Sequence, residues 1–217
     1  GGGRPARVLR RGVPGGGSAG GGGRGVEALG GLRGGKAASG LGEIGDIRRR
    51  LGDLGGAEVA FGRAEALTGG QSPGLALLRL AQRRIDVASA IIANLLAEQT
   101  WNRLARGKLL PARVQIAVAA GDLDAATAAA TELATIAVDF DNPLLAAAAL
   151  TAKGRVQFAL GDDDDACITL RGALRQWQGM DGPYRVARVR PLVGRARRAW
   201  GGEEGRSEEG GGGVEGA

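Results

Sequence analysis

The chain has 217 residues, with 29 lysines and arginines, 23 aspartates and glutamates, no histidine and a formal net charge of +6. Without histidine, Ser-His-Asp and Cys-His catalysis and every zinc site that needs an imidazole are excluded. The single cysteine, Cys167, permits no intramolecular disulfide, and no apolar run approaches the roughly 18 residues of a membrane span. We therefore expect a cytoplasmic protein with no membrane association and no cofactor.

Residues 1–40 are predicted to form a disordered tail rich in glycine and arginine. They hold 17 of the 42 glycines and seven basic residues but only one acid, and such a segment buries too little apolar surface to offset its ordering entropy. The run "GGGSAGGGGRG" (15–25) lacks the Gly-Lys-Ser/Thr ending of a phosphate-binding loop. An RNA-binding arginine-glycine segment is an alternative, but the aromatic residues that usually accompany one are absent. A solvated linker is the favoured interpretation.

Residues 41–200 are predicted to be all-α. Apolar residues recur at spacings of three and four, as in the stripe through Ala166, Leu170 and Trp177, and no alternating β-branched clusters indicate strands. Four prolines are expected near helix starts, where a missing N–H costs little. They are Pro73, Pro111, Pro143 and Pro183.

A turn motif recurs through this segment. "LGDLGGAEVAF" (51–61), "AGDLDAATAAA" (120–130) and "LGDDDDACITL" (160–170) share Gly-Asp, then Ala five residues after the glycine. The glycine can adopt the positive φ that ends one helix, the aspartate can cap the next, and the small alanine lets two antiparallel helices approach closely. We take as the marker of each copy the glycine of the motif, or the residue in its place in a degenerate copy. These markers are Gly52, Arg83, Gly121, Gly161 and Gly201. They lie 31, 38, 40 and 40 residues apart, a period typical of helix pairs stacked in an α-solenoid.

Four consecutive aspartates, at positions 162–165, raise the question of a metal site. A calcium loop needs alternating ligands and a glycine at the bend, whereas consecutive helical residues point about 100° apart. The repeat instead places Asp162 at the turn and the next three in the first turn of a helix, where carboxylates cap N–H groups and meet the positive end of the dipole. We predict no metal site here and a buried, inert thiol at Cys167. Trp101 and Trp177 are expected to pack between helices rather than line a ligand pocket.

Residues 201–217 are predicted to form a second disordered tail, in the place where another helix would be expected. They hold eight glycines and five glutamates with a single arginine. The predicted organisation is therefore a helical repeat domain over 41–200 between two tails.

The repeats resemble tetratricopeptide repeats. The family's small and aromatic positions are matched in the first copy by Gly45, Ala57, Phe61 and Ala64, and in the fourth by Gly154, Ala166 and Ala173. The copies also depart from the family pattern. Leu170 replaces the aromatic residue of the fourth copy, Val114 replaces a glycine of the third, and Gly69 and Gln178 stand where a closing proline is usual.

A narrower resemblance covers about residues 42–201. The segments "SPGLALLRLAQ" (72–82) and "RQWQGMDGPYR" (175–185) are similar to the helical-repeat region that precedes the DNA-binding domain in many LuxR-type transcriptional regulators of high-GC bacteria. The resemblance implies a tetratricopeptide-like α-solenoid that acts as a sensor or protein-interaction module. It implies DNA contact only through a C-terminal helix-turn-helix domain, and no such pattern follows Gly201.

In tetratricopeptide arrays the first helix of each unit lines a concave groove. An arginine-rich groove would favour an acidic peptide or a carboxylate terminus, although a run such as Arg48–Arg50 is more typical of a solvated helix face. Projecting the register onto this sequence gives five candidate partner-binding residues. They are Arg49, Gln115, Arg155, Arg195 and Arg198.

The sequence thus favours a non-catalytic interaction or sensor module that docks a protein partner or a neighbouring domain. A DNA-binding transcriptional regulator that acts directly is the alternative. An enzyme is disfavoured by the missing histidines and by the absence of convergent acid pairs outside the turns.

Overall fold

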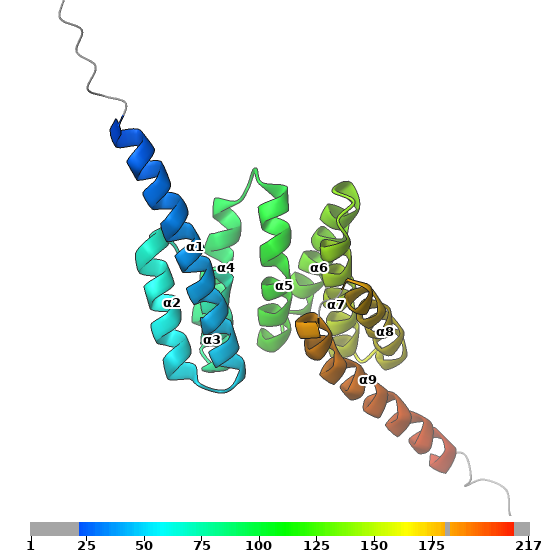
Figure 1. Cartoon of the computed structure of the whole chain (residues 1–217). Coiled ribbons are helices and arrows are strands. Elements are labelled where there is room, and N and C mark those ends of the chain that lie inside the picture. The colour runs from blue at the N-terminus through cyan, green and yellow to red at the C-terminus, as the bar shows by residue number, and fades with distance from the viewer. Residues whose placement is uncertain (1–21, 181–182, 211–217) are drawn as a thin grey trace, which may run out of the picture.

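The computed structural model describes residues 22–180 and 183–210, and the surroundings of side chains within 35–180 and 183–201. These residues form helices joined by short connections and include no strand, which confirms the all-α prediction (Figure 1). Residues 1–21 and 211–217 of the predicted tails lie outside this part of the chain. None of the helices that the structure describes combines the length and the apolar character needed to cross a membrane.

Nine helices run through the described residues. In chain order they are α1 (Gly22–Arg50), α2 (Leu54–Thr68), α3 (Pro73–Ala81), α4 (Ile85–Glu98), α5 (Arg103–Ala120), α6 (Leu123–Asp139), α7 (Pro143–Leu160), α8 (Asp163–Gly179) and α9 (Pro183–Gly210).

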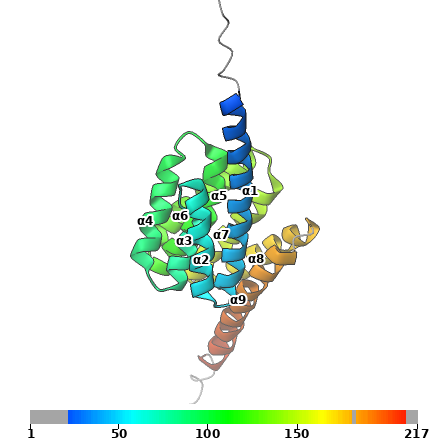
Figure 2. The ribbon, with the colours of Figure 1, turned by 60° about the vertical axis from the view of Figure 1, so that its left-hand side comes forward.

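The helices pack in consecutive pairs, α1 with α2, α3 with α4, α5 with α6 and α7 with α8. Each odd-numbered helix also contacts the next odd-numbered one, so that α1, α3, α5, α7 and α9 form one continuous layer (Figures 1 and 2). Each even-numbered helix packs over the junction between two odd-numbered ones, and within the described residues the backbones of no two even-numbered helices approach closely. The odd-numbered layer therefore offers a continuous surface, whereas the even-numbered helices stand apart from one another.

Two apolar clusters form the interior and meet at α5. The first contains Phe61 and continues through α3 and α4, and the second contains Leu133 and Trp177 and continues to α9. Helix α5 contributes to both, with Ile116 in the first cluster and Val114 in the second. Residues two apart on a helix point in nearly opposite directions, so one helix can join two cores.

The repeat turns have the backbone geometry predicted from the glycines. Gly52, Gly121 and Gly161 follow α1, α5 and α7 with φ values of 85°, 78° and 90°. The degenerate marker Arg83 also has a positive φ, 63°, which is costly for a residue with a Cβ. Gly201 is different. It lies inside α9, so the prediction that it marks a fifth turn is wrong.

Aspartate caps accompany two of these turns. The carboxylate of Asp53 accepts the Gly56 N–H at 2.8 Å, and that of Asp122 accepts the Ala125 N–H at 3.0 Å. Asp162 occupies the same position before α8 but makes no side-chain capping bond, which corrects the predicted cap there. The next three residues are aspartates in the first turn of α8, as predicted, and their like charges oppose the approach of a fourth carboxylate.

The helices extend past both predicted boundaries of the helical domain. Helix α1 begins at Gly22, inside the segment 1–40 assigned to a tail, and α9 continues to Gly210, beyond residue 200. Starting a helix is costly but each added residue contributes one hydrogen bond, so a helix held by packing can continue into weak helix-forming sequence.

The prolines at the starts of α3, α7 and α9 confirm the predicted positions, but Pro111 does not. Pro111 lies inside α5, which begins at Arg103. A proline there removes the bond to the carbonyl of Gly107. Apolar packing of both faces of α5 offsets this cost, which the local sequence does not reveal.

The close contact between α7 and α8 depends on Gly154. A Cβ at this position would lie 2.6 Å from Cγ of Leu170. Gly154→Ala is therefore expected to lower the free energy of unfolding by about 1–3 kcal/mol despite the higher helix propensity of alanine. Gly172→Ala is a matched control because a Cβ there meets nothing within 4 Å. The control should raise the free energy of unfolding by about 0.5–1 kcal/mol. Urea denaturation of both variants measures the two effects, and equal effects would contradict the packing explanation.

Candidate partner-binding groove

The layer of odd-numbered helices carries a groove of about 630 Å³. Residues of α1, α3, α5 and α9 line it, together with Phe61 from α2. Four basic and two acidic side chains face this groove, which gives it a positive character. They are Arg50, Lys108, Arg185, Arg188, Glu43 and Asp46.

A cavity of about 40 Å³ adjoins the groove between α5, α7, α8 and α9. Pro111, Gln115, Arg185 and Arg188 line both spaces, so the cavity continues the groove inward. We call this cavity the arginine pocket. Its polar and aromatic lining residues are Gln115, Thr151, Arg155, Trp177, Arg185 and Arg188.

Aromatic rings contact arginines in and near the arginine pocket. The guanidinium carbon of Arg185 lies 5.0 Å from the centre of the Trp177 ring, and that of Arg195 lies 5.1 Å from the centre of Phe158. Cation–π contacts of this kind hold a guanidinium without neutralising its charge. Because no ion pair joins Arg155, Arg185 or Arg188 to a carboxylate of the described residues, the charges of the arginine pocket stay available to a ligand.

The surroundings penalise these charges. Burial, together with the nearby charges of Arg188 and Arg195, lowers the pKa of Arg155 to about 10. Burial also lowers the pKa of Arg188. The charges of Arg50 and Arg185 add to the effect, and Tyr184 and Asp46 oppose it in part. An anion placed among these guanidiniums would relieve both the lost hydration and the mutual repulsion.

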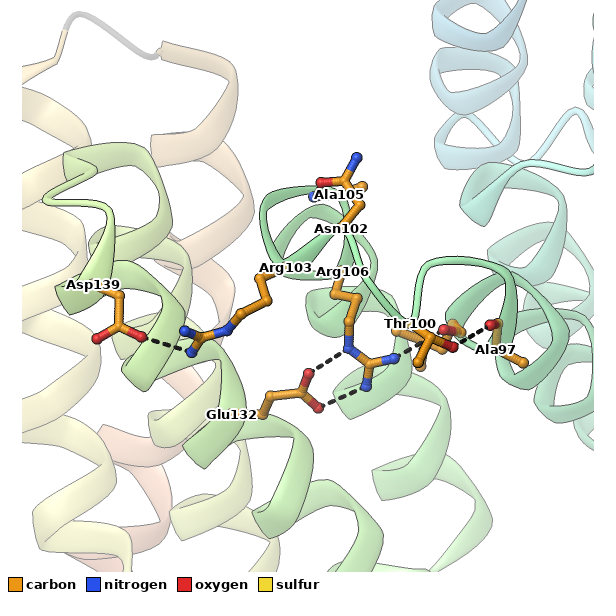
Figure 3. A network of polar contacts seen from close by, with 9 residues as sticks. Ala97, Thr100, Asn102, Arg103, Ala105, Arg106, Glu132 and Asp139 are labelled. Carbon is orange, nitrogen blue, oxygen red and sulfur yellow. Dashed lines mark hydrogen bonds and ion pairs between the residues drawn. The ribbon is translucent and has the colours of Figure 1, made fainter.

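Arginines at the junction of α4, α5 and α6 provide a contrast, because acids neutralise them (Figure 3). Arg106 donates to both carboxylate oxygens of Glu132, at 2.6 and 3.0 Å, and to the Leu96 carbonyl at 2.9 Å. Arg103 pairs with Asp139 at 2.6 Å. These bidentate and simple ion pairs fasten neighbouring helices together and leave little charge for a ligand.

Side-chain contacts join α1 and α9 at the groove. The Tyr184 hydroxyl donates to Oδ2 of Asp46 at 2.6 Å, and the guanidinium of Arg50 lies 4.5 Å from the centre of the Tyr184 ring. Burial alone would raise the pKa of Asp46, but hydrogen bonds from Tyr184, Arg49 and Arg50 outweigh it and lower the pKa to about 2. Asp46 is therefore ionised at neutral pH. It pairs with Arg49 and Arg50 on α1, and its charge also acts on Arg188 from the groove side.

The five residues predicted for the groove lie in different surroundings. Gln115 and Arg155 line the arginine pocket, and Arg195 lies close enough to affect Arg155. Arg49 instead pairs with Asp46 at 2.5 Å, with 11% of its side chain exposed, so it is not part of a solvated face. Arg198 is exposed and lines neither the groove nor the arginine pocket.

Sequence reasoning did not identify four other basic residues of the groove, Arg50, Lys108, Arg185 and Arg188. Arg185 and Arg188 are spaced by three at the start of α9, which indicates one helical face. The repeat register alone does not predict that this face of α9 lies toward the groove, because the prediction also requires the rotation of α9 relative to α7.

The two tryptophans also differ. Trp177 is buried in the C-terminal core, as predicted, and its indole N–H donates to the Thr151 hydroxyl at 3.1 Å. Trp101 is 96% exposed in the connection between α4 and α5, so the prediction that it packs between helices is wrong. It lies outside any helix and has no facing helix to cover it. Cys167 is buried in α8, as predicted.

A larger groove of about 1240 Å³ runs along α6 and α7. Alanine and other apolar side chains form most of its lining, and Asp141 and Lys153 contribute one charge of each sign. This lining selects no particular ligand chemistry, so the positive groove is the stronger candidate site.

No group of three or more His, Cys, Asp or Glu side chains in the described part of the chain is placed to hold a metal ion. The sequence matches no protein-family model and no curated protein.

Proposed function

We propose that the protein is a non-catalytic interaction module, built as a short tetratricopeptide-like α-solenoid, that binds an acidic segment of a protein partner or neighbouring domain in the groove of its odd-numbered helices. The observation that carries the proposal is the set of guanidiniums in and beside the arginine pocket that no described carboxylate neutralises. The LuxR-type resemblance is consistent with such a sensor or interaction role.

The mechanism follows from the shape and charge of the groove. An extended acidic segment would lie across α1, α3, α5 and α9, with carboxylates directed to Arg185, Arg188 and Lys108. Guanidiniums held by aromatic rings lose little rotamer freedom on binding, so more of the pairing energy contributes to affinity. Leu77 and Phe61 supply apolar contact within the same groove.

A direct DNA-binding regulator is the second candidate. Exposed basic residues along α9, including Arg190, Arg197 and Arg198, could contact phosphates. A mobility-shift assay with random and genomic DNA fragments distinguishes the candidates, because a regulator would retain a specific complex in excess competitor DNA and an acidic-peptide module would not.

The interaction proposal is tested with fluorescently labelled peptides rich in glutamate and with glutamine-substituted versions of them. The variant Arg185→Glu/Arg188→Glu, which changes two arginines that line the groove, should bind the acidic peptides at least about tenfold more weakly than the unmodified protein. Arg171→Glu/Arg175→Glu changes the net charge equally on exposed positions of α8, outside the groove, and should bind nearly normally. Equal losses in both variants, with both folded by circular dichroism, would reduce the effect to general electrostatics and reject the groove.

A further inference from the structure

We infer that the arginine pocket is a binding site for a phosphate monoester group, carried by a phosphorylated side chain of the segment that occupies the groove. This inference rests on the proposed function for the location of the ligand and adds the chemistry of one subsite. It draws on the size of the pocket, the helices that supply its polar lining residues and its charge.

The size of the pocket suits one compact group. Its volume of about 40 Å³ exceeds the roughly 10–15 Å³ that a single water requires, so it has room for one compact group. Because Arg185 and Arg188 line both the pocket and the groove, a group attached to a chain in the groove can enter from that side.

The donors approach from three helices. Gln115 lies on α5, Arg155 on α7, and Arg185 and Arg188 on α9. A carboxylate is planar and offers two oxygens, whereas a phosphate monoester offers three terminal oxygens in different directions. Donors supplied by three different helices therefore suit the tetrahedral group better than the planar one.

One other lining residue is already engaged. The Thr151 hydroxyl donates to the Ala147 carbonyl at 2.8 Å and accepts the Trp177 indole N–H at 3.1 Å. These bonds hold the indole whose ring supports Arg185. Thr151 and Trp177 thus position a guanidinium and are not themselves expected to bind the ligand.

The charge of the pocket selects a dianion. Three arginines line it, and none of the lining residues that the structure describes is acidic. The nearest acidic influence is Asp46 in the adjoining groove, which acts on Arg188 and is itself paired with Arg49 and Arg50. A phosphate monoester carries about −1.5 to −2 charges at pH 7, against −1 for a carboxylate, and so neutralises more of the repulsion among the guanidiniums. Arginine forks also bind phosphate oxygens in a bidentate manner.

The test begins with a small probe, N-acetyl-phosphoserine amide, titrated calorimetrically against N-acetyl-glutamate amide at constant ionic strength. We expect the phosphoserine derivative to bind at least about tenfold more tightly. Its affinity should rise from pH 5 to pH 7, as the phosphate loses its second proton near pH 6. Inorganic phosphate should compete with it, which tests the phosphate group apart from the amino acid.

Three variants locate the site. Arg188→Gln should remove the preference for phosphoserine, Arg188→Lys should keep part of it by retaining charge without the fork, and Arg171→Gln on the exposed face of α8 should leave it unchanged. Circular dichroism verifies that each variant is folded. Equal affinity for the two probes, or a preference that survives Arg188→Gln, would overturn the inference.

A second arm separates this inference from the proposed function. Peptides of one acidic sequence carry phosphoserine, glutamate or serine at a central position. Groove-dependent binding of all three with equal affinity retains the interaction module and rejects the phosphate site. If the small phosphoserine probe binds in an Arg188-dependent manner but no peptide binds, the phosphate site is retained and the peptide groove is rejected. Failure of both the small probe and the peptides rejects both proposals.

Discussion

Phe61→Ala is expected to lower the free energy of unfolding by about 3–5 kcal/mol, the cost of removing a large buried aromatic side chain. Phe61 is 3% exposed and belongs to the N-terminal apolar cluster. Its ring fills the space beside two glycines, since a Cβ at Gly45 would lie 2.9 Å from the ring and one at Gly74 would also collide with it. Because the ring touches α1 and α3 from α2, its loss should loosen three helices at once.

Urea denaturation followed by circular dichroism measures this effect. Phe61→Leu is the control, because it keeps most of the apolar volume, and it should cost about 1.5 kcal/mol or less. A loss of less than 1 kcal/mol for Phe61→Ala would show that Phe61 does not carry the packing of α1 against α2 and α3.

Arg155→Met is expected to act in the opposite direction and raise the free energy of unfolding by about 1–3 kcal/mol. Arg155 is half-buried, and no ion pair joins it to a carboxylate of the described residues. Replacing a desolvated charge by an apolar side chain of similar length removes the hydration cost and the repulsion from Arg188 and Arg195.

The same substitution should abolish stabilisation by phosphate. Unmodified protein should melt at a higher temperature when millimolar phosphate replaces chloride at equal ionic strength, because a ligand that binds only the folded state stabilises it. The Arg155→Met protein should show no such shift. The exposed substitution Arg171→Met is the control for a general effect of losing one positive charge. If Arg155→Met were destabilising, favourable contacts would hold Arg155 in place, and the electrostatic argument for an anion site would be rejected.

Local physical chemistry explains the features that could be predicted from the sequence. The positive φ at Gly52, Gly121 and Gly161 could be predicted because glycine adopts that conformation without strain. Helical periodicity likewise placed Ala166 and Leu170 in the interior, where both are at most 1% exposed. Both effects act within one or two turns of chain, so the surrounding fold changes them little.

Capping and helix boundaries were less predictable because neighbouring groups compete. Asp162 stands where Asp53 and Asp122 cap their helices, yet three adjacent carboxylates oppose its approach to the backbone. Pro111 would mark a helix start by local preference alone. Its place inside α5 depends on apolar packing from both cores, which offsets the missing hydrogen bond.

The candidate site is almost wholly a product of tertiary structure. The repeat register predicted that Gln115 and Arg155 lie at the partner-binding surface, and both line the arginine pocket. It did not predict that Arg185 and Arg188 of α9 also line this pocket. It also gave no indication of the bond between Tyr184 and Asp46, which are 138 residues apart. Such contacts depend on how far each helix is rotated against the next, and small rotations add up along the array.

The sequence by itself thus determined an all-helical chain with turns at its Gly-Asp motifs, because backbone preference and apolar period are local properties. Only the tertiary structure decided which arginines remain without an acidic partner. Arg103 and Arg106 pair with carboxylates of α6, whereas Arg155 and Arg188 line the same pocket and repel each other. The difference lies in the opposing helix, since a guanidinium's charge is neutralised or left available only by the groups packed against it.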